Sequence, residues 1–150
     1  MTAYPDTSFL CALYRLQDNS PVAAAHFKAM TEPLHVTGLL LYEFRQSLRF
    51  QVWCHTHDPK KGFPDADCDK ALADLQSDLD SGAVVIAAAD WAEVHYTAER
   101  LSSAHTKAEG HRALDTLRVA TALHLEAKEF LTFDERQRKL ALAERLAVKP

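Results

Sequence analysis

The sequence has few cysteines, no long apolar run and no secretory signal, which are the marks of disulfide-bonded, membrane and secreted proteins. It has three cysteines in 150 residues, Cys11, Cys54 and Cys68, with no Cys-x-x-Cys spacing. An odd number without that spacing predicts free thiols rather than a disulfide framework. No apolar run approaches the roughly 20 residues that span a bilayer, and the N-terminus lacks the basic-then-apolar order of a secretory signal. We therefore expect a cytoplasmic protein without a membrane segment.

A basic excess is absent as well, since the formal net charge is −4. This charge argues against a protein that coats nucleic acid by bulk electrostatics. The hydrophobic content of 47% and the charged content of 25% are ordinary for a globular protein. A chain of this length suits one domain, and we expect residues 1–150 to form it.

Short apolar runs alternate with longer segments of helical spacing. The predicted strands are residues 1–5, 34–36, 83–89, 129–133 and 146–148. The predicted helices are residues 7–17, 20–30, 39–53, 70–79, 91–101, 114–127 and 135–144. Residues 54–69, rich in Pro, Gly and charge, are predicted to form a surface loop, and 102–111 a polar connection. The alternation predicts an α/β protein whose parallel sheet is covered on both faces.

The stretch from His111 to Gln137 organises this pattern, because it reads as a buried helix, a buried strand and a second helix. Asp115 lies at the entrance of the first helix, and Asp134 directly follows the strand. Ligand sites of open α/β sheets lie just beyond the carboxyl ends of the strands. Asp134 is therefore expected at the edge where such a site would form.

Two further acids are predicted to converge with Asp115. Asp6 follows the first strand, in which Pro5 must take the last position because it lacks a backbone N–H. Glu43 is on an apolar helical face, with no Lys or Arg three or four residues away. Four acids without an obvious buried cation would repel one another unless a hard divalent cation binds them. We therefore expect Mg²⁺ or Mn²⁺, and not zinc.

Three of the four acids also have an ordinary structural interpretation. Asp6 can cap the helix that begins at Thr7, and Asp134 has capping-box spacing to Gln137. Asp115 can cap its own helix or pair with Arg118. Glu43 is harder to explain in this way, because an acid on an apolar face needs neutralisation.

The four acids together resemble a known family. Asp6-Thr7-Ser8, Glu43 near the start of its helix, Asp115 in LDTLRVATAL and Asp134 in FLTFDERQ are similar to PIN-domain nucleases, specifically VapC-type ribonuclease toxins. The resemblance covers nearly all of the chain and implies a PIN-like three-layer α/β/α sandwich with a mainly parallel central sheet. It also implies hydrolysis of RNA phosphodiester bonds, a homodimer and a cognate antitoxin that neutralises the enzyme.

In this interpretation Asp6 and Asp115 are the principal metal ligands, while Glu43 and Asp134 bind a second ion or hold metal-bound water. One or two hard cations would direct a water at the phosphodiester, and no covalent nucleophile is required. The negative net charge is compatible with a nuclease because bound cations reverse the local sign of the charge.

Four further residues are predicted around these acids. The hydroxyls of Ser8 and Thr132 are candidates to support the ligands, and Arg112 and Arg118 to contact RNA phosphates. For each of them a helix cap or a solvated, helix-paired charge is the alternative. The loop at 54–69, with Lys60, Lys61 and Phe63, is where we would first look for RNA specificity.

Other functions remain open from the sequence. A catalytically silent PIN-like binding module is one, although all four acids are present; a non-toxin nuclease of RNA processing or of DNA is another. A small antitoxin reading frame beside the gene would distinguish the toxin. A zinc site of Cys54, His55, His57 and Cys68 is discounted because the spacing fits no zinc motif.

Overall fold

Strands and helices alternate along the chain in a computed structural model that describes residues 3–150. The strands are β1 (Ala3–Pro5), β2 (Leu34–Val36), β3 (Val84–Ile86), β4 (Glu129–Leu131) and β5 (Ala147–Lys149). The helices are α1 (Thr7–Tyr14), α2 (Ser20–Ala29), α3 (Gly38–His57), α4 (Asp65–Ser81), α5 (Trp91–Leu101), η1 (Ser102–Thr106), α6 (Lys107–Glu109), α7 (Ala113–His124) and α8 (Glu135–Ala143). The predicted α/β class is confirmed.

Every strand pair is parallel, as the alternation of strands and helices predicts. The order β1-β4-β5 forms one sheet and β2-β3 a second, while β1 and β2 lie side by side. Pro5 pairs with Leu131, and Leu131 pairs with Lys149, so these three strands end at one level. Pro5 is the last residue of β1, as its missing N–H requires. The residues that follow β1 and β4 therefore begin at the same edge.

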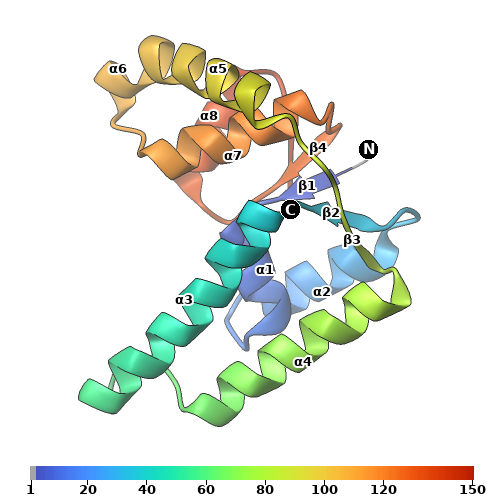
Figure 1. Cartoon of the computed structure of the whole chain (residues 1–150), viewed down its shortest axis with the longest axis vertical. Helices are drawn as coiled ribbons and strands as arrows, with labels where there is room; N and C mark the ends of the chain where they lie inside the picture. Colours follow the sequence, from blue (N-terminus) through green and yellow to red (C-terminus); the bar gives the residue numbers. More distant parts are fainter. Residues whose placement is uncertain (1–2) are drawn as a thin grey trace.

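Helices cover the strands from both sides (Figure 1). α5, α7 and α8 lie on one side of the strands, and α1, α2 and α4 lie on the other. The core between them contains the fully buried aromatic rings of Phe9, Phe44 and Phe130. α7 presents only small or branched side chains to this core, including Val119 and Ala120, which lets it pack closely against its neighbours.

The predicted loop at 54–69 is much shorter in the structure. α3 continues to His57 and α4 begins at Asp65, so only residues 58–64 are irregular. In the last turn of α3 the exposed Thr56 hydroxyl donates to the Val52 carbonyl, and at the start of α4 the negative charge of Asp65 interacts favourably with the positive end of the helix dipole. Gly62 has a φ of 60°, and a Cβ there would collide with the carbonyl of Gln51. The segment therefore folds back onto α3.

The hypothesis that this segment determines RNA specificity stays a prediction, and the structure shows how its Phe63 is placed. Its ring is partly buried and stacks under the guanidinium of Arg15, 4.8 Å from the ring centroid. Lys60 and Lys61 are exposed, and Lys61 is close to Asp58. The two lysines are thus accessible to a partner.

The predicted polar connection at 102–111 is largely helical. α5 continues through the π turn η1 into α6, and Gly110, with a φ of 70°, ends the helix. The extension is held from outside: Glu144, just after α8, accepts from Arg100 Nη2 at 2.7 Å and contacts His105 Nε2 at 2.9 Å. Glu144, some 40 residues away, therefore stabilises this helix, which the polar composition of 102–111 does not predict.

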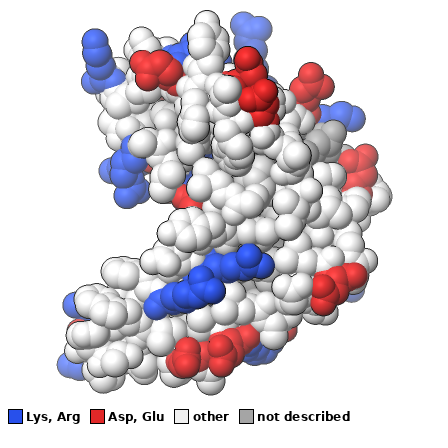
Figure 2. Space-filling model, viewed as in Figure 1, with Lys and Arg blue, Asp and Glu red and all other residues white. Residues whose placement is uncertain are grey.

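The three cysteines are free within the part of the chain that is described, as predicted. No helix among residues 3–150 combines the length and apolar character needed to cross a bilayer. Acidic and basic side chains are scattered over the face shown in Figure 2, with a row of basic side chains over α3. The same face is hollowed between α3 and the helices above it.

The Glu144 contacts predict a pH-dependent contribution to stability. Hydrogen bonds from Arg100, followed by His105, lower the pKa of Glu144 below its ordinary value of 4.5. A lowered pKa in the folded state stabilises the fold above that ordinary value, and the contribution is lost as the pH falls through the folded-state pKa. Glu144→Gln should therefore reduce the free energy of unfolding at pH 7 by roughly 0.5–1 kcal/mol. Urea denaturation at pH 7 and pH 3 measures this difference, which should be smaller at pH 3. Glu135→Gln, which removes an exposed acid, is the control. An equal loss of unfolding free energy in both variants would contradict a specific contribution of the Glu144 contacts.

Candidate active site

Asp6 is the most deeply buried acid of the predicted site. It follows β1 and caps α1, since its Oδ1 accepts from the backbone N–H of Phe9 at 2.9 Å. The same oxygen accepts from the Ser8 hydroxyl at 2.6 Å, and Oδ2 accepts from the Thr132 hydroxyl at 2.6 Å. Burial raises the pKa of Asp6, and these hydrogen bonds oppose that shift. The carboxylate is therefore held in one orientation.

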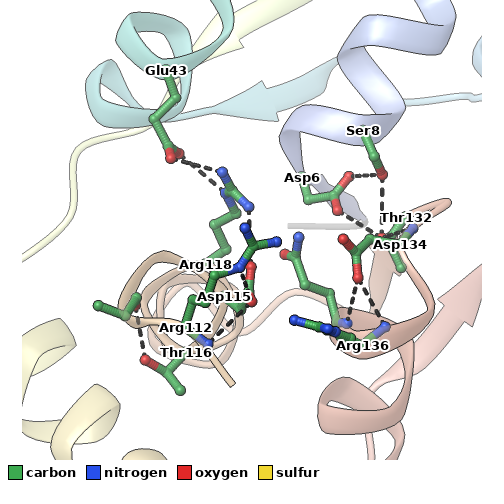
Figure 3. A network of polar contacts seen from close by, with 12 residues as sticks. Asp6, Ser8, Glu43, Arg112, Asp115, Thr116, Arg118, Thr132, Asp134 and Arg136 are labelled. Atoms are coloured by element: carbon green, nitrogen blue, oxygen red, sulfur yellow. Dashed lines mark hydrogen bonds and ion pairs between the residues drawn. The ribbon is translucent and has the colours of Figure 1, made fainter. Parts of the chain in front are cut away.

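The two hydroxyls also tie the segment after β4 to the end of β1. Ser8 Oγ accepts from the backbone N–H of Phe133 at 2.9 Å, and Thr132 Oγ1 accepts from that of Asp134 at 2.9 Å. Each hydroxyl thus donates to Asp6 while it accepts from the neighbouring chain (Figure 3). The prediction that Ser8 and Thr132 support an acid agrees with these contacts.

Asp134 lies beside this network, and its carboxylate caps α8. Its Oδ1 accepts from the backbone N–H groups of Arg136 and Gln137, at 2.8 and 3.1 Å, and so caps α8. The capping interpretation of Asp134 is therefore confirmed. Its backbone N–H donates to Thr132, and its role in the site stays a prediction (Figure 3).

Asp115 comes from the first turn of α7. Its Oδ2 accepts from the backbone N–H of Arg112 at 3.2 Å, which confirms the helix-capping interpretation. The side chain is 4% exposed, and its Oδ1 lies 3.6 Å from Arg118 Nη1. Asp115 therefore caps the helix and also lies against a buried cation.

Glu43 has a cationic partner that the sequence analysis missed. Arg118 donates to both of its carboxylate oxygens, from Nε to Oε2 at 3.1 Å and from Nη2 to Oε1 at 2.7 Å. The side chains are 9% and 14% exposed, so the pair is largely buried. The expectation that Glu43 has no buried cation is wrong, because the partner is 75 residues away on α7. Local helical spacing cannot show such a pair.

The two arginines predicted to contact RNA differ in the structure. Arg112 is 72% exposed, so its role as a phosphate contact stays a prediction. Arg118 is largely buried, which lowers its pKa, but the hydrogen bonds and charge of Glu43, together with the charges of Asp6 and Asp115, give a net rise in its pKa. The structure therefore favours an internal role for Arg118 over a contact with RNA.

Tyr4 was not singled out from the sequence. It precedes Asp6 by two residues on an extended segment, and such spacing places both side chains on one face. Burial raises the pKa of Tyr4 to about 12, and its hydroxyl lies 3.0 Å from Thr37 Oγ1 at the start of α3. Tyr4 thus connects β1 to the helix that carries Glu43.

The donor set of the site fits a hard divalent cation. Asp6 and Asp115 are buried and Glu43 is largely buried, and the charges of all three act on the guanidinium of Arg118. Two negative charges remain without compensation when the three acids are ionised, and oxygen donors suit Mg²⁺ or Mn²⁺. Within residues 3–150, no three His, Cys, Asp or Glu side chains are arranged close enough to hold a metal ion. The guanidinium between Glu43 and Asp115 accounts for their separation.

Comparison with known proteins gives a family and two structural neighbours. The family model of the PIN domain matches residues 3–142. The crystal structure of Mycobacterium tuberculosis VapC20, described as a toxin that cleaves the sarcin-ricin loop, is similar with a TM-score of 0.65 and 16% identity, over 92% of this chain and 94% of that one. The structure of FitAcB from Neisseria gonorrhoeae is similar with a TM-score of 0.63 and 17% identity, over 99% and 97%. A search of curated proteins found no significant match.

The network around Asp6 predicts a specific cost of removing one hydroxyl. Thr132→Val keeps the shape of the side chain but removes the donor to Asp6 and the acceptor for the Asp134 N–H. Because both partners are largely buried, we expect a loss of about 1–3 kcal/mol in the free energy of unfolding. Urea denaturation measures this loss, with Thr56→Val, at an exposed position of α3, as the control. Equal stability of the two variants would show that the network contributes nothing.

Proposed function

The chain belongs to the PIN-domain family, and from that premise we propose that it is a metal-dependent endoribonuclease of the VapC toxin type. The observation that carries this proposal is the buried group of Asp6, Glu43 and Asp115 around one guanidinium, which leaves negative charge uncompensated. The fold shared with VapC20, a toxin described as cleaving the sarcin-ricin loop, supports the choice of RNA as substrate.

We assign the principal metal ligands to Asp6 and Asp115, with Mg²⁺ or Mn²⁺ as the ion. A bound divalent cation supplies a water of lowered pKa and stabilises charge on the phosphoryl oxygens. Ser8 and Thr132 fix the orientation of Asp6, so the carboxylate need not reorganise when the ion binds. Glu43 and Asp134 are the other two acids of the proposed site, and they are not principal ligands of the ion.

The partners of the protein follow from the same proposal. We propose that residues 1–150 form one PIN domain that acts as a homodimer and that a cognate antitoxin keeps silent. Such an antitoxin would place a peptide in an apolar groove and a cationic side chain among the carboxylates. A groove of about 630 Å³ lies at the C-terminal end of α1, the opposite end from Asp6. Its lining is mixed: it includes Leu13, Leu16 and Phe63, but also Arg15, Asp67, Lys70 and Asp74.

Cleavage of a structured RNA by the purified protein tests the activity. We expect cutting in Mg²⁺ or Mn²⁺ and none in EDTA. Asp6→Asn and Asp115→Asn should each reduce the rate by roughly 100-fold or more, because each removes a ligand charge. Asp80→Asn, at an exposed acid of α4, should cut as the wild type does. Metal-independent cutting, or equal cutting by all variants, would overturn the proposed site. Absence of cutting by folded, antitoxin-free protein would favour the silent binding module, and cutting of DNA alone would favour a non-toxin nuclease.

Expression in cells tests the toxin role separately. Wild-type protein produced without its antitoxin should arrest growth, and Asp6→Asn should not, because the loss of catalysis removes the toxicity. Co-expression of a small reading frame adjacent to the gene should restore growth and co-purify with the protein. Normal growth with active wild-type enzyme would reject the toxin role and leave the nuclease activity standing.

A further inference from the structure

Arg118 engages two acids of the proposed site at once. Its Nε and Nη2 donate to the two oxygens of Glu43, and its Nη1 lies 3.6 Å from Asp115 Oδ1 (Figure 3). The two-pronged contact with Glu43 matches the planar geometry of a guanidinium and a carboxylate, which makes it the stronger of the two. Arg118 thus joins α7 to α3 across the site.

Glu43 is therefore the least available of the buried acids. Both of its oxygens already accept hydrogen bonds from a cation, in a pair that is shielded from water. Asp115 meets the same guanidinium only at 3.6 Å, and Asp6 is hydrogen-bonded to neutral donors alone. A metal ion at Glu43 would lie against the positive guanidinium of Arg118, which repels it, whereas no cation among residues 3–150 is in contact with Asp6.

The net charge of the acids and Arg118 also favours a single bound cation. Asp134 is only partly buried and Arg112 is 72% exposed, so water screens both charges. The other three acids, when ionised, and the guanidinium of Arg118 leave two negative charges, which a single divalent cation neutralises. A second divalent cation would leave the buried group with an uncompensated positive charge, which a low-dielectric surrounding disfavours. Arg118 thus carries the positive charge that a second ion would otherwise supply.

Building on the proposed function, we propose that Arg118 withholds Glu43 from the metal-ligand set, so that the site takes one divalent cation on Asp6 and Asp115. Arg118 is then a positioning residue, because it acts through Glu43 and does not touch the ion. The Glu43–Arg118 pair is, as a unit, dispensable for metal binding.

A charge-matched double variant tests this directly. Glu43→Gln/Arg118→Met removes one negative and one positive charge together, and neutral replacements of similar volume are well tolerated at buried ion pairs. Isothermal titration with Mn²⁺ should give one ion per chain for the wild type and for the double variant. The two dissociation constants should agree within about threefold, because the ligands and the net charge are unchanged. Circular dichroism confirms that both proteins are folded.

The single variant Arg118→Met should bind Mn²⁺ differently, because it frees Glu43 and deletes a competing cation. We expect affinity at least roughly tenfold higher than that of the wild type, or a second ion. Arg112→Met is the matched control: its guanidinium also lies 3.6 Å from Asp115 but is 72% exposed. Water screens that charge, so we expect a change below about threefold.

The outcomes separate this proposal from the proposed function. A tenfold or greater loss of Mn²⁺ affinity in the double variant, or two ions in the wild type, would make Glu43 a ligand and overturn the role of Arg118 while the metal-dependent nuclease stands. Folded wild type that binds no Mn²⁺ would overturn both. If Arg118→Met does not fold, the stoichiometry of the wild type and the affinity of the double variant still decide.

Discussion

The structure depends on the compensation of charges that lie inside it. Asp6, Glu43 and Asp115 come from β1 and α1, α3 and α7, and one guanidinium, that of Arg118, lies among them. A buried carboxylate that loses its cation is strongly destabilising, whereas a well-placed pair is close to neutral. Any shift of α3 against α7 would separate Glu43 from Arg118 and leave both charges buried. The relative position of the two helices is therefore coupled to the site that they carry.

Besides charge compensation, the site depends on the parallel arrangement of β1 and β4, which fixes the position of Asp6. Both strands end at the same level, where Pro5 pairs with Leu131. Ser8 and Thr132 use this juxtaposition, since each donates to Asp6 and accepts a backbone N–H from the segment after β4. The hydroxyls thereby satisfy a buried carboxylate and two backbone donors together. The result is a rigid acid at the carboxyl edge of the strands, where ligands of α/β sheets commonly bind.

Local patterns predicted most of the fold and part of the site. The strands and the apolar helices were found because periodicity of two or 3.6 residues is a local property. The segments 54–69 and 102–111 were predicted to be irregular but are largely helical. For 102–111 the reason is a distant partner, Glu144, which stabilises a helix of polar composition. The capping interpretations of Asp6, Asp115 and Asp134 are confirmed, and they do not compete with a place in the site. A cap occupies only some of a carboxylate's acceptor positions, as Oδ1 of Asp134 shows.

The sequence by itself determined the α/β class, the free thiols and the order of four acids at strand ends and helix starts. These properties depend on spacing along the chain, which a sequence displays directly. Only the tertiary structure decided which cation meets Glu43, which hydroxyls hold Asp6 and how far Arg118 is buried. Those contacts join residues 75 and 126 positions apart, and they form only where helices and strands pack. Local spacing reaches about one helical turn, so it carries no information about such pairs.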